Sequence, residues 1–137
     1  MKDRLALLVS ALWWGSLTTI GFLVVPMLFA HLGNPALAGS LAGRLFSAQS
    51  WVSLACGLVL LAYFRSKIQT RVDAPSRISI AWVVVALLLA LLQEYAVAPR
   101  ILARENLRLW HSLGSAMYLG QWLSAGVLLW RLGRREG

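Results

Sequence analysis

The 137-residue chain contains little charge and almost no cysteine. Charged residues make up 13% of the sequence, against roughly a quarter in an average soluble domain. The one cysteine, Cys56, can form no disulfide within the chain, and its mid-run position favours a packing role. The sequence also has no nucleophile–base pair, no glycine-rich phosphate loop and no Cys-x-x-Cys-His motif. These absences give covalent catalysis no support, so a non-enzymatic role is expected.

Apolar residues are abundant instead, at 59% of the sequence, and they are concentrated in four stretches. Each stretch is roughly 20 residues or longer, enough for a helix to cross a hydrocarbon core of about 30 Å. A soluble protein of this length could not bury four helices that are apolar all round. We therefore predict an all-α, four-helix transmembrane bundle in a single integral membrane domain, residues 1–137. Its helices are expected over about 5–30, 35–64, 78–104 and 107–131.

Basic residues outnumber acidic ones by thirteen to five, and their distribution predicts the topology. In a membrane protein such residues mark the cytoplasmic side, so the bilayer is the expected partner and nucleic acid is not. The prediction is a multi-pass protein of the bacterial inner (plasma) membrane, with both termini cytoplasmic. Nine basic residues fall on the predicted cytoplasmic side: Lys2, Arg4, Arg65, Lys67, Arg71, Arg77, Arg131, Arg134 and Arg135. Four fall on the other side: Arg44, Arg100, Arg104 and Arg108.

The predicted helix ends show a weak internal repeat. Pro26 stands seven residues before the helix stop Gly33, and Pro99 stands seven residues before Asn106. Two helical hairpins of the same orientation are predicted, related by a pseudo-two-fold axis along the membrane normal, with chance similarity as the alternative. Each proline is expected to kink its helix and to free a carbonyl one turn earlier. After Gly33, Asn34 is the expected cap of a helix that begins at Pro35.

Small residues recur every fourth position on three of the predicted helices. Such a stripe lets helix backbones approach closely, so packing inside the bundle is expected. A homodimer through Gly39 and Gly43 is the alternative. The predicted packing residues are Gly15, Gly39, Gly43, Gly57, Ala116, Gly120 and Ser124.

Several short motifs resemble a known family. The segment "WWGSLTTIGFLVVPMLFAHL", followed by "AGSLAGRLFSAQSW", is similar to the start of the transmembrane-protein-205-like family, whose bacterial members are domain-of-unknown-function four-helix membrane proteins. "YAVAPRI" and "LWHSLGSAMYL" resemble its later signatures. The chain departs from the family pattern at Gln93, Glu94 and Tyr118. More distantly, the layout resembles four-helix copper-resistance and haem-pathway membrane proteins, which implies histidines that bind metal or haem.

Polar side chains near the predicted outer end of the helices form the candidate site. Ionisable groups inside a bilayer are costly, so each is a functional candidate. A small-cation or metal site is one hypothesis, with His31, His111, Met27 and Glu94 as ligands. Haem held between the two histidines is a second, and a ligand-free structural or accessory protein is a third. In that last case Glu94 pairs with Arg44, Arg100 or His111. The polar site is expected to comprise Glu94, His111, Arg44, Arg100, Gln93 and Tyr118.

Overall fold

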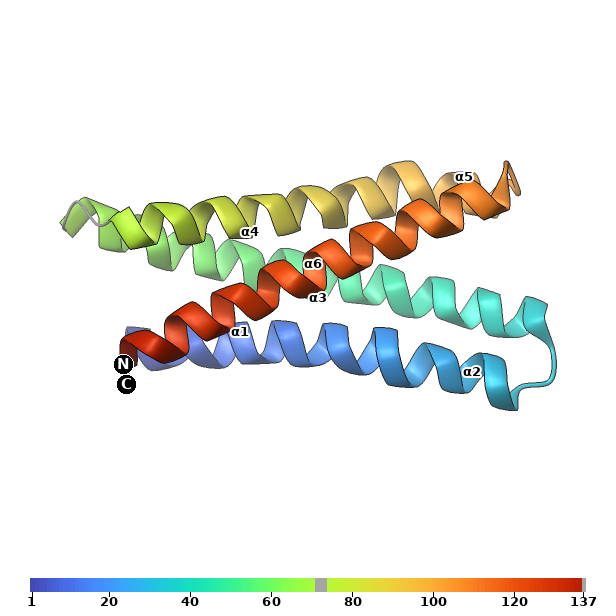
Figure 1. Ribbon diagram of the computed structural model, residues 1–137, viewed down its shortest axis with the longest axis horizontal. Coiled ribbons are helices and arrows are strands. Elements are labelled where there is room, and N and C mark those ends of the chain that lie inside the picture. Colours follow the sequence, from blue (N-terminus) through green and yellow to red (C-terminus); the bar gives the residue numbers. More distant parts are fainter. Residues whose placement is uncertain (71–73, 137) are drawn as a thin grey trace.

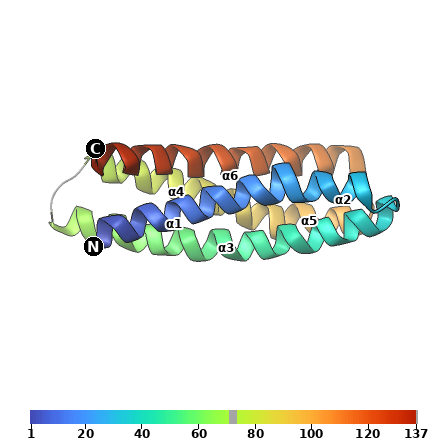
Figure 2. The same ribbon diagram turned by 90° about the horizontal axis from the view of Figure 1, so that it is seen from below.

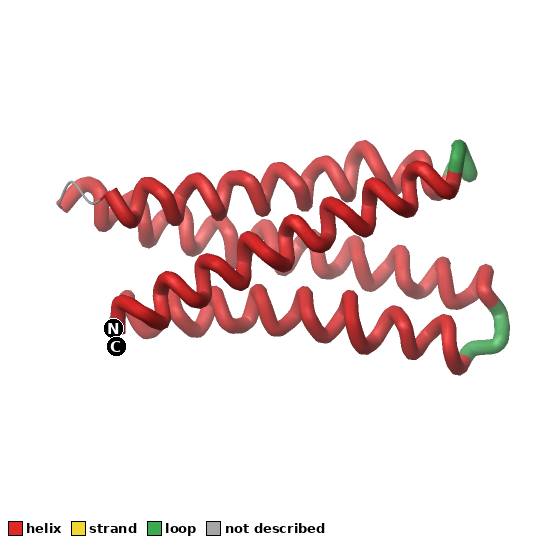
Figure 3. The backbone as a smooth tube through the Cα atoms, in the orientation of Figure 1, coloured by secondary structure: helices red, strands yellow, loops and turns green. Residues whose placement is uncertain are grey.

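The computed structural model describes residues 1–70 and 74–136, and these form helices and tight turns without a strand (Figure 3). The first long segment comprises α1 (Lys2–Thr19), the π-helical turn η1 (Ile20–Val24) and α2 (Val25–His31). The second is α3 (Pro35–Thr70). The third comprises α4 (Ala74–Leu92), the π-helical turn η2 (Gln93–Val97) and α5 (Ala98–Leu102), and the fourth is α6 (Leu107–Glu136).

The turn between α2 and α3 confirms the sequence signals at this boundary. Gly33 has a φ of +66°, the left-handed conformation that commonly ends a helix. The Asn34 side-chain oxygen accepts hydrogen bonds from the backbone N–H groups of Ala36 and Leu37, at 3.1 and 3.3 Å. Pro35 is the first residue of α3. Asn34 therefore caps the helix, as predicted.

At the other end of the bundle the helices run further than predicted. The helix expected to end at residue 64 continues to Thr70, the one expected from 78 begins at Ala74, and α6 reaches Glu136. Hydropathy marks the part of a helix that can lie in hydrocarbon, and polar residues extend the helix beyond it. Arg71 and the Arg135 side chain, counted above, lie outside the described part of the chain, as does Asp73 before α4.

The four long segments form a ring in which α1 and α4 each pack against both α3 and α6 (Figure 1). Both termini lie at one end of the bundle, and the two short turns, 32–34 and 103–106, lie at the opposite end (Figures 1 and 2). We call the end with both termini the terminal end and the end with the two turns the turn end. There α2 packs against η1 and α3, and α5 packs against η2 and α6. The two hairpins therefore separate beyond the π-helical turns, as Figure 1 shows.

Three helical segments are long and apolar enough to cross a membrane: Lys2–His31, Pro35–Gln69 and Pro75–Leu102. The fourth, α6, is long enough but less apolar, because it carries polar side chains. Tyr118, Gln121 and Ser124 are all buried in the bundle rather than on its surface. Part of the lower hydropathy of α6 thus comes from polar side chains that face the bundle interior.

Glycines admit close helix contacts at some of the predicted positions. A Cβ at Gly57 would lie 2.4 Å from Leu87 Cδ2, and one at Gly120 would lie 2.8 Å from Leu89 Cδ1, so these glycines pack α3 and α6 against α4. Ser124 is buried, but Ala116 is exposed. A Cβ at Gly15, Gly39 or Gly43 would have no described neighbour within 4 Å. Packing through these three is not seen within the chain, and the homodimer stays a prediction.

Candidate functional site

Both prolines are preceded by a widened helical turn. In η1 the backbone N–H of Val25 donates to the carbonyl of Ile20, and in η2 that of Ala98 donates to Gln93, each spanning five residues instead of four. Proline has no N–H, so the regular ladder is interrupted at Pro26 and Pro99 and the preceding turn relaxes. The predicted kinks therefore take the form of π-helical turns, which recur at functional sites. Each begins six residues before its proline.

Glu94 lies in η2 and meets Ser47 of α3. The Ser47 hydroxyl is 2.9 Å from Oε1 and 3.1 Å from Oε2 of the carboxyl group. Both side chains are half-buried. Among the side chains that the structure describes, no lysine, arginine or histidine lies within ion-pair distance of this carboxyl; an ion pair is seen instead between Lys67 and Asp3. Glu94 thus has a neutral hydrogen-bond donor where a cationic partner was expected.

The three expected partners of Glu94 lie elsewhere. Arg44 is exposed, and Arg100 is exposed with its guanidinium 4.6 Å from the centre of the Trp110 ring. A Cβ at Gly114 would touch Val97, and Gln121 bonds to Gln93, which fixes the register of α6 against this segment. His111 therefore lies near the level of Arg100, roughly 9 Å along the axis from Glu94. A long charged side chain such as that of Arg44 or Arg100 extends to the membrane–water interface at a lower free-energy cost than it pairs with a buried carboxyl. This explains why neither arginine contacts Glu94.

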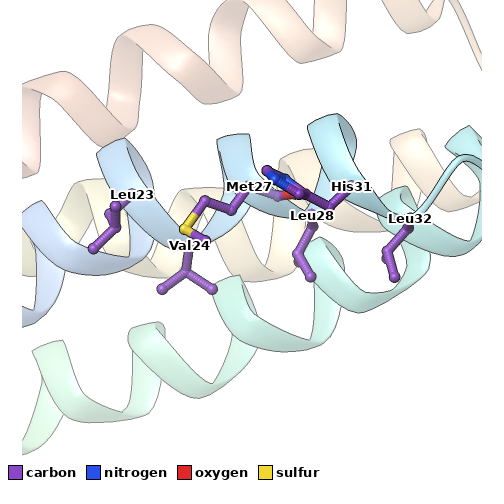
Figure 4. Close-up of a pocket in the computed structure, with 6 residues that line it drawn as sticks. All are labelled: Leu23, Val24, Met27, Leu28, His31 and Leu32. Atoms are coloured by element: carbon purple, nitrogen blue, oxygen red, sulfur yellow. The ribbon is translucent and has the colours of Figure 1, made fainter.

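The expected metal ligands do not converge. His31 and Met27 share one face of α2, as their spacing predicts, and line a shallow apolar hollow with leucines and Val24 (Figure 4). The His31 ring lies 3.1 Å from the Met27 carbonyl oxygen. His111 lies in the second turn of α6, and α6 diverges from α2 at the turn end (Figure 1). The described residues contain no group of three or more His, Cys, Asp or Glu side chains that could hold a metal ion.

The other two polar candidates, Gln93 and Tyr118, have buried partners. Gln93 Oε1 accepts a hydrogen bond of 2.6 Å from Gln121 of α6. The Tyr118 hydroxyl donates to the Leu17 carbonyl at 2.6 Å, and its ring packs edge-on against Phe46. A Cβ at Gly21 would lie 2.3 Å from this ring, so Gly21 is the residue that admits it. Both candidates therefore join helices inside the bundle.

A polar seam between α1 and α3 was missed by the sequence analysis. Trp13 donates its indole N–H to Ser53 at 3.0 Å, and Gln49 donates to Ser16 at 3.0 Å. All five of its members are uncharged, and none of them marks a clear break in an apolar run, so the seam was not recognised. The available signal was periodicity: Gln49 and Ser53 are four residues apart on α3 and face Trp13 and Ser16, three apart on α1. We define the seam as Ser10, Trp13, Ser16, Gln49 and Ser53.

Ser10 is the seam residue nearest the termini, and it is unsatisfied. Its side chain is 0% exposed, and its hydroxyl has no hydrogen-bond partner among the described residues. The Trp13–Ser53 bond sets the antiparallel register, which places Ser10 at the level of Cys56, itself buried. A buried hydroxyl without a partner is unfavourable, because it has given up its bonds to water. It is the one side-chain atom of this kind in the described part of the chain.

At the terminal end a charged cluster closes the α1–α3 interface. Lys67 Nζ lies 2.7 Å from Asp3 Oδ1, and the Tyr63 hydroxyl donates to the same carboxylate. Lys67 also lies 5.3 Å from the centre of the Tyr63 ring. On the opposite side of the bundle, Arg131 donates to Ser79 at 3.2 Å and to the Pro75 carbonyl at 3.0 Å. Charged side chains at the terminal end thus join α1 to α3 and α6 to α4.

Comparisons with known proteins give one match. The sequence profile of a family described as "Domain of unknown function (DUF4149)" matches residues 8–109. The match covers most of α1, all of α3 to α5 with both π-helical turns, and ends at the start of α6. No curated protein and no solved structure matches the chain. The matched region contains Glu94, Ser47 and the whole seam.

Proposed function

Since the chain belongs to the family described as a domain of unknown function (DUF4149), we propose a function from its own geometry. We propose that it is a four-helix integral membrane protein whose Glu94 binds and releases a proton, without catalysing a covalent reaction. The small-cation site expected from the sequence is thus proposed to be a proton site. The observation that supports it is the Glu94 carboxyl, which has a hydroxyl partner in Ser47 and no cationic one among the described side chains.

The membrane placement rests on helix length and charge. Three segments meet the requirements for a span, and α6 packs against two of them along its length, so it crosses with them. Three of its polar side chains, those of Tyr118, Gln121 and Ser124, are buried in the bundle and so are shielded from lipid. The basic residues gathered at the terminal end support the proposal that both termini are cytoplasmic and that the protein lies in a bacterial plasma membrane. The turn end then faces outward.

The position of Glu94 explains why an unpaired carboxylate is unfavourable there. The Pro75–Leu102 segment has 28 residues. At 1.5 Å per residue it is roughly 42 Å long, so a centred hydrocarbon core of about 30 Å leaves roughly 6 Å outside at each end. Glu94 is eight positions before Leu102, roughly 12 Å along the helix. Its carboxyl therefore lies inside the hydrocarbon region, where an isolated negative charge is strongly disfavoured.

A proton neutralises this carboxyl with the ligands that are present. Zinc and similar transition-metal sites use three or more protein ligands in a fixed geometry, and the described residues supply no such group of His, Cys, Asp or Glu side chains. A proton needs one oxygen, and the protonated carboxyl can still accept the Ser47 hydrogen bond. Haem is not favoured, since His31 and His111 lie on diverging helices.

Infrared spectroscopy of the protein in lipid vesicles tests the proposal. A protonated carboxyl has a C=O stretching band distinct from that of a carboxylate. We expect such a protonated-carboxyl band in the wild-type protein, and we expect it to disappear in Glu94→Gln. Glu105→Gln is the matched control, because Glu105 lies exposed in the turn between α5 and α6. The proposal is wrong if the Glu94 carboxyl stays ionised at every pH at which the protein is folded; a ligand-free accessory role then remains.

A further inference from the structure

We propose that the second turn of the bundle, residues 103–106 between α5 and α6, is the centre of a docking surface for anionic phospholipid headgroups. The surface is formed by three exposed arginines, Arg100, Arg104 and Arg108. The inference rests on the membrane placement proposed above, and it does not depend on whether Glu94 carries a proton. The occupant is the phosphate-bearing headgroup of a lipid with a net negative charge, such as phosphatidylglycerol.

The two turns at the turn end differ in charge. Residues 5–43, which include the first turn, contain no Asp, Glu, Lys or Arg. Residues 99–111, which include the second turn, contain three arginines and one acidic residue, Glu105, so three positive charges and one negative charge give a net charge of +2. Arginines on the proposed outer side oppose the charge bias that sets the orientation of a membrane protein. Topology therefore does not account for them.

The second turn has an arginine at a backbone position where glycine is usual. The N–H of Arg104 donates to the carbonyl of Ile101 at 3.0 Å, which is one of the two bonds of a Schellman motif. The N–H of Glu105 donates to the carbonyl of Arg100 at 3.1 Å, which is the other. Arg104 has the left-handed φ of 56° that the motif requires. Gly33 meets the same requirement in the first turn without the steric cost of a side chain, so the fold alone favours glycine at position 104 as well.

The arginines lie at the depth of lipid headgroups. The Pro75–Leu102 segment extends roughly 6 Å beyond a centred hydrocarbon core, and the headgroup layer is roughly 5–7 Å thick. Arg100 is two positions before the end of this segment, and its guanidinium lies 4.6 Å from the centre of the Trp110 ring. Tryptophan is typical of the membrane–water interface. Because this contact sets the end of α5 level with the start of α6, Arg108, two positions before Trp110, falls at the same depth.

The side chains between the arginines favour a lipid over a water-soluble anion. Leu102 is 84% exposed and Leu109 is 46% exposed, which is unfavourable in water but not beside the upper part of an acyl chain. A guanidinium group donates paired hydrogen bonds to phosphate oxygens. None of the three arginines forms an ion pair with a carboxylate among the described side chains, so this capacity is not used within the chain. A phospholipid supplies the phosphate and the apolar chain together.

Fluorescence quenching by labelled lipids tests the surface. A dye is attached at Ala103→Cys in a Cys56→Ala background, and the full chain is placed in phosphatidylcholine vesicles. A small fraction of added lipid, either phosphatidylglycerol or phosphatidylcholine, carries a nitroxide quencher on its acyl chain near the headgroup. We expect the phosphatidylglycerol label to quench the dye about two-fold more than the phosphatidylcholine label, because arginines enrich anionic lipid around them. The matched control is a dye at Ala36→Cys, exposed beside the neutral first turn, which both labels should quench equally.

Substitution of the arginines links the preference to this surface. Glutamine at all three positions, Arg100→Gln, Arg104→Gln and Arg108→Gln, should make the two labels quench the dye at position 103 equally. Lysine at the same positions should keep the preference, since it keeps the charge. Equal quenching in the chain with its native arginines overturns the proposal. A preference that survives the glutamine substitutions, or that is as large at position 36, overturns it as well.

Salt provides a second measurement if the glutamine variant fails to fold. At about 1 M salt the Debye length is about 3 Å, so the chain with its native arginines should lose its preference for phosphatidylglycerol. A preference that salt leaves unchanged overturns the proposal. Quenching by neither label contradicts the membrane placement itself, which separates that failure from a missing lipid preference. The carboxyl band of Glu94 reports on proton binding independently of all these results.

Discussion

A single methyl group added at Gly21 should destabilise the bundle, against the usual preference of helices for alanine. Its Cβ would lie 2.3 Å from Cε1 and 3.0 Å from Cζ of the Tyr118 ring. The ring has little room to withdraw. Its hydroxyl is held at the Leu17 carbonyl at 2.6 Å, and its ring meets the Phe46 ring at 70° with centroids 5.2 Å apart. The contact joins the first and last long segments of the chain.

The magnitude follows from three opposing effects. Replacing a helical glycine by alanine contributes about 1 kcal/mol of stability when there is space for the methyl group. Overpacking a well-filled interior costs roughly 1–3 kcal/mol. Displacing the tyrosine also breaks its hydrogen bond, for about another 0.5–1.5 kcal/mol. We therefore expect Gly21→Ala to lower the free energy of unfolding by roughly 1–3 kcal/mol.

Thermal unfolding in detergent, followed by far-UV circular dichroism, measures this change. Gly43→Ala is the control, because a Cβ there has no described neighbour within 4 Å, and it should be neutral or stabilising. In a Tyr118→Leu background Gly21→Ala should lose most of its effect, since contacting residues couple in double-mutant cycles. A Gly21→Ala variant as stable as wild type would refute the packing described for η1.

Two further substitutions test the helix contacts. Gly57→Ala should be destabilised relative to Gly43→Ala on the same helix, by about 1–2 kcal/mol in thermal unfolding, because its Cβ would lie 2.4 Å from Leu87 Cδ2; equal melting temperatures would contradict this. Gln121→Leu should cost about 1–3 kcal/mol, because it leaves Gln93 without its 2.6 Å partner, whereas the double variant Gln93→Leu with Gln121→Leu should recover most of the loss. A double variant no better than Gln121→Leu alone would show that the amide pair is not the cause.

Much of the fold could be predicted because hydrophobic runs and turn residues act locally. Gly33, Asn34 and Pro35 mark their boundary within the six residues that form it. The π-helical turns could be anticipated as interruptions at Pro26 and Pro99, though not as widened turns, since that choice depends on neighbouring helices. The repeat of two hairpins stays a prediction, and the equal spacing of both turns from their prolines is in keeping with it.

The candidate site could be predicted in position but not in its partners. Glu94 is conspicuous in an apolar run, yet its contact with Ser47 spans 47 positions of sequence and depends on the register of α3 against α4. Counting depth alone placed Arg44, Arg100 and His111 near it, because depth ignores which face of each helix a side chain occupies. Ser10 could not be recognised at all, since a serine in an apolar run is unremarkable until its lack of a partner is known.

The bond between Tyr118 and Leu17 also sets an order of events during synthesis. The two residues are 101 positions apart. At about 5–20 residues per second, a ribosome needs roughly 5–20 s to deliver Tyr118 after Leu17 has been made. During that interval no Tyr118 ring packs against Gly21 in η1. Thr18 also lacks the hydrogen bond that Trp122 of α6 later donates to it. The first hairpin therefore stays in the membrane with the α1–η1 face that α6 later covers still exposed. A chaperone or insertion factor would encounter that face before the second hairpin is made.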